Sequence, residues 1–254
     1  MELGKPLLNS FFRNVLLKAS ILAWMALAFS PPSYAFEEKN NPQLAHSQET
    51  VVLIHGLIRT TFSMIFLKHF LEKQGYHVYN YGYPSTRYTI KQHSITLNKF
   101  IEKQIRDNPT QTIHFVTHSL GGIILRDALA RRNKNQLRNI GHIVMLAPPN
   151  QGSFYAKLTT EALPILDSLI KPLPELSEAP KSYIRQLPPP NVKLAIIAGR
   201  YDAKVPPAYA RLEGVKDFAI VNAAHTFIMN NSTARQLIKE YLQSGSFDAV
   251  KHES

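Results

Sequence analysis

The stretch that decides the fold runs Thr112-Ile113-His114-Phe115-Val116-Thr117-His118-Ser119-Leu120-Gly121-Gly122. A strand is predicted for residues 112–116 and a helix for residues 120–132, so Ser119 lies on the tight turn that joins them. A hydroxyl raised on such a turn can attack an ester, provided that small residues two positions before and after the serine let the turn pack. Gly121 meets this requirement, whereas the β-branched Thr117 makes the motif imperfect. We therefore take Ser119 as the candidate nucleophile, with a helix-capping serine as the alternative.

Strand-like and helix-like segments alternate along the chain around this turn. Residues 51–54, for example, form a continuous apolar run, which suits a strand that is buried on both faces. Strands that alternate with helices indicate a doubly wound, mostly parallel sheet with helices on both faces, so the predicted fold class is α/β. Strands are expected at 51–54, 77–81, 112–116, 143–147, 192–198 and 217–221, and helices at 60–74, 89–106, 120–132 and 232–243.

The alternation predicts one domain, residues 50–245, after an exposed lead-in at 36–49 and before a C-terminal tail at 246–254. Residues 152–190 interrupt the pattern, because they hold seven of the seventeen prolines and carry an apolar side. An insertion of this length is often a lid or a binding element. We expect a lid over an acyl pocket, and a structural excursion packed on the sheet is the alternative.

Residues 1–35 have the features of a secretory signal peptide. Lys5, Arg13 and Lys18 form a positive front section, which precedes an apolar run of twelve residues and the small-x-small sequence Ser33-Tyr34-Ala35. The apolar run is shorter than the about 20 residues that a membrane span needs. We therefore expect an exported protein, periplasmic or secreted after cleavage. An uncleaved N-terminal membrane anchor is the alternative.

The composition narrows the possible partners and cofactors. The chain has 254 residues, of which 44% are hydrophobic, and no cysteine, which excludes disulfides, thiolate metal sites and a cysteine nucleophile. A net charge of +11 suits nucleic acid or an anionic membrane surface. The basic residues are scattered along the chain, however. The segment with the most basic residues, 126–138, is interpreted as the solvent-exposed end of a helix. We expect no nucleic-acid partner, while peripheral membrane contact stays open and no pattern indicates an oligomeric state.

A serine nucleophile needs a base, and the base needs an acid partner. Among ten histidines, His225 follows the last predicted strand, where parallel sheets carry their functional loops. His118 adjoins the serine, but its side chain should point away from the raised hydroxyl. Asp202 follows the fifth predicted strand, and Asp167 in the expected lid is its main substitute. No metal or cofactor is expected, because the chain has neither a His-x-x-x-His helix nor a dinucleotide fingerprint.

Four separated motifs make the chain resemble the α/β-hydrolase family, and within it the small bacterial lipases and esterases. The resemblance implies an oxyanion hole formed by the backbone N–H groups of Leu57 and Leu120. It also implies that Gly56 allows close backbone approach and that His55 supports the loop without transferring protons. The motifs, in chain order, are His55-Gly56-Leu57, the serine turn, Gly199-Arg200-Tyr201-Asp202 with Val205-Pro206, and Ala224-His225.

The function that this resemblance implies is hydrolysis of a small-molecule acyl ester or lipid by an esterase or lipase. Ser119, Asp202 and His225 would form the triad, in the chain order that this fold uses. Because a fold does not choose its reaction, an acyltransferase or an amide or thioester hydrolase with the same triad is the alternative. A non-catalytic binding protein is less favoured, because all three residues are present.

Overall fold

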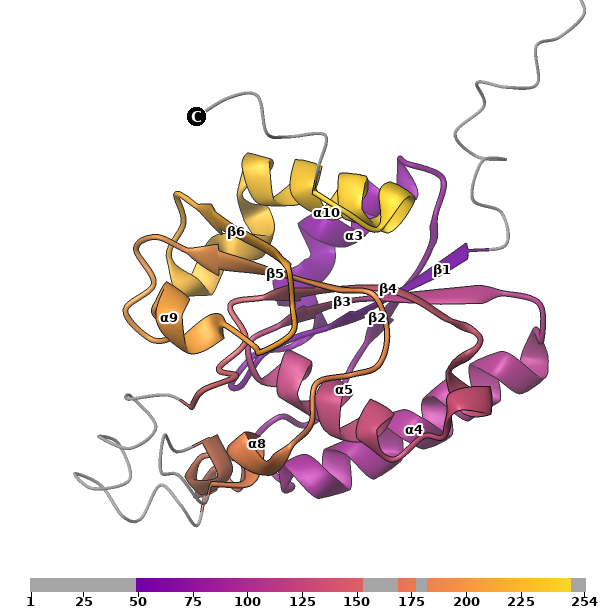
Figure 1. The fold of residues 1–254 in the computed structure, drawn as a ribbon, viewed down its shortest axis with the longest axis horizontal. Coiled ribbons are helices and arrows are strands. Elements are labelled where there is room, and N and C mark those ends of the chain that lie inside the picture. The colour runs from indigo at the N-terminus through magenta and orange to yellow at the C-terminus, as the bar shows by residue number, and fades with distance from the viewer. Residues whose placement is uncertain (1–48, 153–168, 177–181, 248–254) are drawn as a thin grey trace, which may run out of the picture. The chain divides into compact units, whose positions relative to one another are not determined.

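The computed structural model, which describes residues 49–152, 169–176 and 182–247, contains a six-stranded parallel sheet between two layers of helices (Figure 1). The strand order is β2-β1-β3-β4-β5-β6, and every neighbouring pair is parallel. This confirms the predicted α/β class with a doubly wound sheet. The strands are β1 (Glu49–Ile54), β2 (His77–Tyr81), β3 (Thr112–His118), β4 (Ile140–Leu146), β5 (Leu194–Gly199) and β6 (Asp217–Val221).

The burial of each strand follows its place in the sheet. All six residues of β5, a strand with neighbours on both sides, are buried, whereas only Val221 is buried in the edge strand β6. A central strand of a parallel sheet is covered by helices on both faces and therefore needs apolar side chains at consecutive positions. The continuous apolar runs in the sequence have this physical cause.

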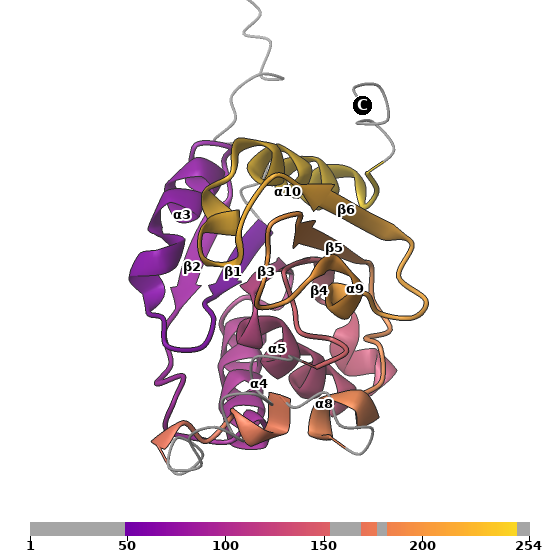
Figure 2. The same ribbon diagram turned by 90° about the vertical axis from the view of Figure 1, so that its left-hand side faces the viewer.

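Helices cover both faces of the sheet (Figures 1 and 2). On one face, α3 and α10 pack against each other, and on the other α4 packs against α5. The helix α4 begins at a capping box in which Thr89 and Gln92 exchange hydrogen bonds, and α10 ends at Gly245 with φ of 74°. Among the described residues, the helices of eight or more residues are α3 (Ile65–Glu72), α4 (Ile90–Asp107), α5 (Leu120–Ala130) and α10 (Ser232–Ser244).

Two hydrophobic cores result, one on each face of the sheet. Successive side chains of a strand point to opposite faces, so β1 serves both cores. Val51 and Leu53 join the core under α3 and α10, and Val52 and Ile54 join the core under α4 and α5. Packing on both faces fixes the position of each strand in the sheet. It therefore also fixes the positions of the strand ends, where the candidate site lies.

The short helices, apart from η2 within the predicted helix at 60–74, are elements that the sequence did not predict. The predicted helix at 60–74 is a 3-10 turn followed by α3, and β4 begins three residues before its predicted start at residue 143. A helix of three to six residues completes at most about two turns, so it leaves no periodic apolar pattern to read. The elements concerned are η2 (Thr61–Met64), η3 (Lys134–Leu137), η4 (Pro174–Leu176), α8 (Tyr183–Gln186), α9 (Pro207–Ala210) and η5 (His225–Asn230).

The described parts of the insertion pack on the α4–α5 face. Leu173, Leu176 and Ile184 are buried in that core, and the Glu175 carboxylate accepts a hydrogen bond of 2.7 Å from the Ile90 N–H at the start of α4. The rest of the expected lid lies outside the described residues. So do the expected signal peptide, nearly all of the lead-in, most of the C-terminal tail, and Asp167.

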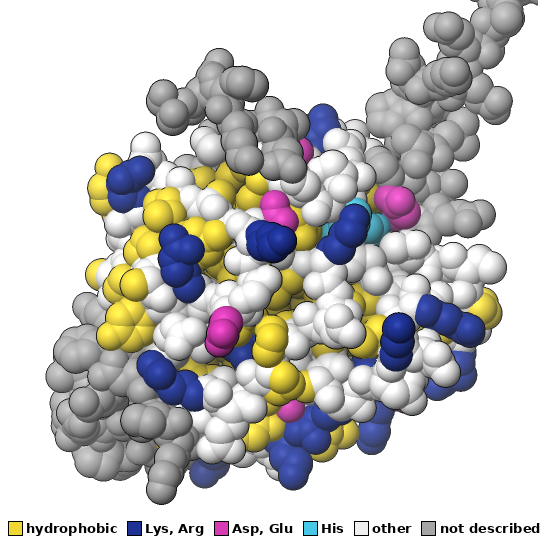
Figure 3. All heavy atoms as spheres, in the orientation of Figure 1, with side chains coloured by type: hydrophobic (Ala, Val, Ile, Leu, Met, Phe, Trp, Pro, Cys, Tyr) yellow, Lys and Arg dark blue, Asp and Glu magenta, His cyan; other side chains and the backbone are white. Residues whose placement is uncertain are grey.

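No helix within the described ranges combines the length and the hydropathy that crossing a membrane requires. Basic side chains are spread over the face shown in Figure 3, with apolar and neutral side chains between most of them, and several adjoin one another along its lower edge. This distribution matches the scattered charges of the sequence.

Arg126 corrects one expectation, because it is buried in α5 and is not part of a solvated helix end. Its guanidinium donates one hydrogen bond of 2.9 Å to the Asn150 Oδ1 atom and another to the Leu187 carbonyl oxygen. Burial lowers the pKa of Arg126 to about 10, which leaves it protonated at neutral pH. Arg126 therefore fastens both ends of the 152–190 insertion to α5.

Replacing Arg126 by methionine should lower the free energy of unfolding by about 1–3 kcal/mol, because the acceptors on Asn150 and Leu187 lose their donor. The methionine keeps an apolar chain in the space, so the loss reports mainly on the hydrogen bonds. Arg106→Met, an exposed change in the last turn of α4, should stay within about 0.5 kcal/mol. Urea unfolding of the three proteins measures the difference, and equal stability of the two variants would contradict the structural role.

Candidate active site

The candidate site residues lie at one edge of the sheet, where the parallel strands end. The register pairs Ile54 of β1 with Thr117 of β3, and Gly199 of β5 with Val221 of β6, so the loops that follow leave the sheet at similar heights. Open α/β sheets carry their ligand sites at this edge. The loops after β1, β3, β5 and β6 supply, in that order, Leu57, Ser119, Asp202 and His225.

Ser119 occupies a strained turn between β3 and α5. Its φ of 52° and ψ of −121° are uncommon for a residue with a side chain, and its backbone N–H donates to the Leu146 carbonyl at 2.9 Å. A Cβ atom at Gly121 would lie 2.6 Å from the Ile54 carbonyl oxygen, so the close approach of α5 to β1 requires glycine. Thr117, the imperfect position of the motif, is fully buried, so the turn accommodates its branched side chain.

The structure brings Ser119, His225 and Asp202 into one hydrogen-bonded chain. The Ser119 hydroxyl lies 3.0 Å from His225 Nε2, and His225 Nδ1 lies 2.7 Å from Asp202 Oδ2. With an ionised carboxylate, the Nδ1–H group donates to Asp202, which leaves Nε2 bare to accept from Ser119. The other Asp202 oxygen accepts backbone N–H bonds from Lys204 and Val205 at 2.9 and 2.7 Å, so the carboxylate is held at both oxygens.

His118 holds the loop that carries His225. Its Nε2–H group donates to the His225 carbonyl at 3.0 Å, and the two rings lie 5.0 Å apart between centroids. Burial first, and then the neighbouring His225, hold the pKa of His118 well below its usual range, so the ring is neutral. His118 therefore acts on the backbone of the base and not on the hydroxyl, in line with the expected direction of its side chain.

The loop after β1 lies directly against Ser119. A Cβ atom at Gly56 would lie 3.1 Å from the Ser119 Cβ atom and 2.9 Å from the His118 ring, so only glycine allows this approach. Leu57 follows in the half-buried turn, and Leu120 is the first residue of α5. The N-terminus of a helix presents unpaired N–H groups and partial positive charge, which favours an anion at this position.

His55 and Tyr83 support this loop through a ring stack and a hydrogen bond. The two rings stack at 4.3 Å between centroids, and the Tyr83 hydroxyl donates to the His55 carbonyl at 2.8 Å. Burial lowers the pKa of His55 as well, so the ring stays neutral. The contacts of His55 are those of a packed supporting residue.

The sequence analysis did not predict two supporting hydrogen bonds of the site. One runs from the Tyr83 hydroxyl to the His55 carbonyl, and the other from His118 to the His225 carbonyl. Tyr83 follows β2 at the same sheet edge as the other site residues. This position after a strand end could have identified Tyr83 from the sequence as a residue of the site. Asn150, which follows β4 at the same edge, accepts a hydrogen bond from Arg126 and donates one to the Ala210 carbonyl. Within 49–152, 169–176 and 182–247, no three His, Cys, Asp or Glu residues gather in an arrangement that would hold a metal ion.

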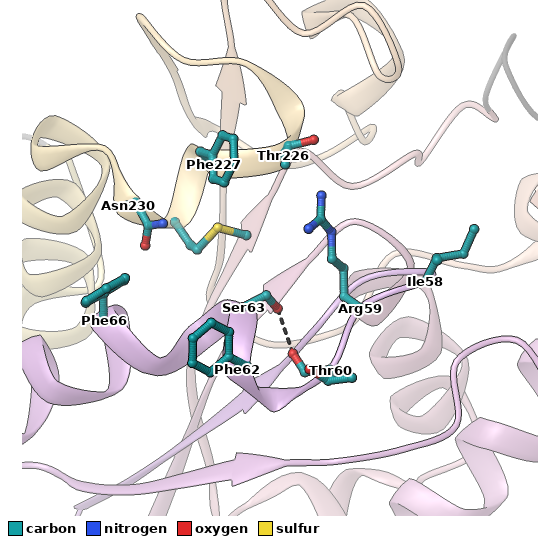
Figure 4. Close-up of a pocket in the computed structure, with 10 residues that line it drawn as sticks. Ile58, Arg59, Thr60, Phe62, Ser63, Phe66, Thr226, Phe227 and Asn230 are labelled. Atoms are coloured by element: carbon teal, nitrogen blue, oxygen red, sulfur yellow. Dashed lines mark hydrogen bonds between the residues drawn. The ribbon is translucent and has the colours of Figure 1, made fainter.

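A pocket of about 310 Å³ opens beside the site, between the loop after β1 and the residues that follow His225 (Figure 4). Arg59 extends from the first of these segments toward the second. Phe62, Phe66 and Phe227 give the pocket apolar walls.

A family model for palmitoyl protein thioesterase matches residues 50–185. The matched range contains Ser119 and both proposed oxyanion donors, and it ends before Asp202 and His225. It covers more than half of the chain.

Solved structures share the fold at low sequence identity. Aspergillus fumigatus lipase B has a TM-score of 0.65 at 16% identity, over 84% of this chain and 55% of that chain. The mature Bacillus licheniformis lipase BlEst2 has a TM-score of 0.62 at 17% identity, over 78% and 92% of the two chains. Phospholipase PlaB from Legionella pneumophila has a TM-score of 0.53 at 22% identity, over 64% of this chain and 44% of that chain, so the match spans less than half of the phospholipase. These likenesses confirm the predicted fold.

His93 makes the stability of this region dependent on pH. It is buried in α4 with its ring 4.8 Å from the Tyr83 ring, and burial lowers its pKa to about 4. Between pH 6.5 and pH 4 the unfolded chain binds a proton at this ring and the folded protein does not, so stability falls as the pH falls. One such group contributes a slope of up to about 1.4 kcal/mol per pH unit.

His93→Gln should therefore show a shallower loss of unfolding free energy between pH 6.5 and pH 4 than the wild type. His77→Gln changes an exposed histidine of β2 and should keep the wild-type slope. Urea unfolding at half-unit pH steps measures both slopes. A His93→Gln slope equal to that of the wild type would exclude the buried neutral imidazole.

Proposed function

The chain belongs to the palmitoyl protein thioesterase family, and on this premise we propose that it is a serine hydrolase that cleaves carboxylic acyl esters with Ser119, His225 and Asp202 as its catalytic triad. The observation that carries the proposal is the unbroken chain of hydrogen bonds from the Ser119 hydroxyl through His225 to the Asp202 carboxylate. This is the arrangement that makes a serine hydroxyl nucleophilic.

In the first half-reaction, Ser119 attacks the substrate carbonyl carbon while its proton moves to His225 Nε2. The imidazolium that forms is stabilised by the Asp202 carboxylate at Nδ1. The C–O bond of the ester then breaks, the leaving alcohol takes the proton from Nε2, and the acyl group stays on the Ser119 oxygen. Asp202 stays ionised throughout.

The negative charge that develops on the carbonyl oxygen needs preorganised donors. We assign this role to the backbone N–H groups of Leu57 and Leu120. Support comes from the contact of Gly56 with Ser119 and from the place of Leu120 at the start of α5. Because Tyr83 and His55 hold the loop in place, the donors need little reorganisation when the charge appears.

In the second half-reaction, water replaces the alcohol. His225 Nε2 takes a proton from the water, the hydroxide attacks the acyl carbon, and the proton then returns to the Ser119 oxygen as the carboxylic acid leaves. The same donors stabilise the same charge. The enzyme is regenerated without a cofactor.

Lipid-like esters are the substrates that we favour. The proteins of similar fold are named as lipases and as a phospholipase, which supports ester hydrolysis in general. Apolar side chains are exposed beside the site, as expected for an enzyme that handles acyl chains or approaches a lipid surface.

A thioester hydrolase is the second candidate, because the matching family model is that of palmitoyl protein thioesterase. The same triad would act, with a thiolate as the leaving group.

Ser119→Ala should abolish covalent labelling by a fluorophosphonate probe, which reacts with activated serines. The wild type and Ser244→Ala, a surface change at the end of α10, should be labelled equally. Asp202→Asn should lower kcat for acyl-ester hydrolysis by about 10⁴-fold, because the imidazole loses its orientation and the stabilising charge. A folded wild-type protein that takes no label would refute the proposal.

A matched pair of substrates separates the two leaving groups: O-octanoyl-N-acetylethanolamine and S-octanoyl-N-acetylcysteamine differ only in one oxygen or sulfur atom. We expect comparable kcat/KM values for the two, because carbonyl attack and the proposed oxyanion donors are common to both. Both activities should disappear in Ser119→Ala. Cleavage of the thioester alone would establish the second candidate instead.

A further inference from the structure

The pocket is lined on one side by residues that follow Leu57 and on the other by residues that follow His225. Its walls include Thr226 and Phe227, which directly follow His225. During acylation the leaving oxygen must come within hydrogen-bond reach of His225 Nε2, because it takes its proton from that atom. The part of the substrate attached to this oxygen is therefore directed toward the segment that continues from His225.

Among the described residues that line this pocket, Arg59 is the one with a charged side chain. It has no hydrogen-bond or ion-pair partner anywhere in the described ranges, although it lies two residues after Leu57. Its guanidinium extends toward Thr226 and Phe227 across the pocket (Figure 4). The positive charge is close enough to the site to act on the buried His118 ring.

A guanidinium without a partner beside a reaction centre is suited to an anion. Arginine stays protonated, and its planar set of N–H donors matches the oxygens of phosphate and carboxylate groups. Thr60 and Thr226 add hydroxyl groups to the same pocket, which suits the several acceptor oxygens of a phosphate. None of the described residues that line the pocket is acidic, so none of them repels such a group.

The apolar walls suit an amphiphile better than a free ion. Phe62, Phe227 and Ile58 line the pocket and are 77%, 65% and 67% exposed. Exposed aromatic side chains around one cation present both an apolar and a positive surface. The net charge of +11 also attracts anionic substrates from a distance.

We propose that this pocket binds the leaving-group part of the substrate and that Arg59 selects acyl esters whose alcohol carries a phosphate. The substrate class is then a phosphate-bearing glycerol ester of a fatty acid. The assignment rests on the proposed function, because it uses the position of His225 as the proton donor. Arg59 binds the substrate and takes no part in proton transfer.

Binding measured without turnover tests the assignment. In a Ser119→Ala background, calorimetry would compare 1-hexanoylglycerol 3-phosphate with 1-hexanoylglycerol, two soluble esters that differ only in the phosphate. We expect tighter binding of the phosphate ester, and Arg59→Gln should weaken it by about 10- to 100-fold, the range for a charge-assisted hydrogen-bonded contact. Arg59→Lys should restore part of the loss, because it returns the charge without the fork of donors.

Arg138→Gln is the matched control, since it removes an exposed positive charge just before β4, at the opposite edge of the sheet. It should bind both esters as its Ser119→Ala parent does. In proteins that retain Ser119, Arg59→Gln should lower the ratio of kcat/KM for the phosphate ester to that for the neutral ester by a similar factor.

Three results would overturn the assignment: equal affinity for the two esters, equal weakening by Arg138→Gln, or competition by inorganic phosphate at the affinity of the ester, which would make the pocket a site for a free anion. Arg59-dependent binding in a wild-type protein that cleaves no acyl ester would support the pocket and count against the hydrolase. The two proposals therefore fail separately.

Discussion

The approach of α5 to the end of β1 is the contact on which the candidate site depends. Gly121 rests against the Ile54 and His55 carbonyl oxygens at a distance that no side chain permits. This contact sets the height of Ser119 above the sheet and brings the loop of Gly56 against it. The nucleophile and both proposed oxyanion donors are therefore positioned by close packing of the backbone, and close-packed interiors have low compressibility.

Neutral rings support the site around this contact. His118 holds the carbonyl of His225, and Tyr83 holds the carbonyl of His55. Burial disfavours the charged form of the imidazoles, so these residues act as hydrogen-bond donors and packing surfaces with no charge of their own. Were His118 protonated, its charge would lie beside His225 and oppose the imidazolium that the proposed reaction forms.

The sequence predicted what depends on local pattern and missed what depends on distant contacts. The strands β2 and β6 have the predicted bounds, and the residues proposed as nucleophile, acid and base meet, because each follows a strand whose end the apolar pattern reveals. Arg126 was misjudged because its partner Leu187 lies 61 residues away along the chain. Tyr83 was missed for a similar reason, since its hydrogen bond to His55 spans 28 residues. Partners so far apart in the sequence can be identified only from the three-dimensional arrangement of the strands and loops.

The bonds from Arg126 to Asn150 and Leu187 have a consequence for how this fold can vary. They join α5, the helix behind the nucleophile, to the chain just before and near the end of the 152–190 segment. Between these two points the segment also supplies Leu173, Leu176 and Ile184 to the buried core. The free energy of closing a loop grows only slowly with its length. Natural variation or protein engineering can therefore lengthen or shorten the segment if these three core side chains are kept, and substrate preference can diverge while the chemistry of the sheet edge stays constant.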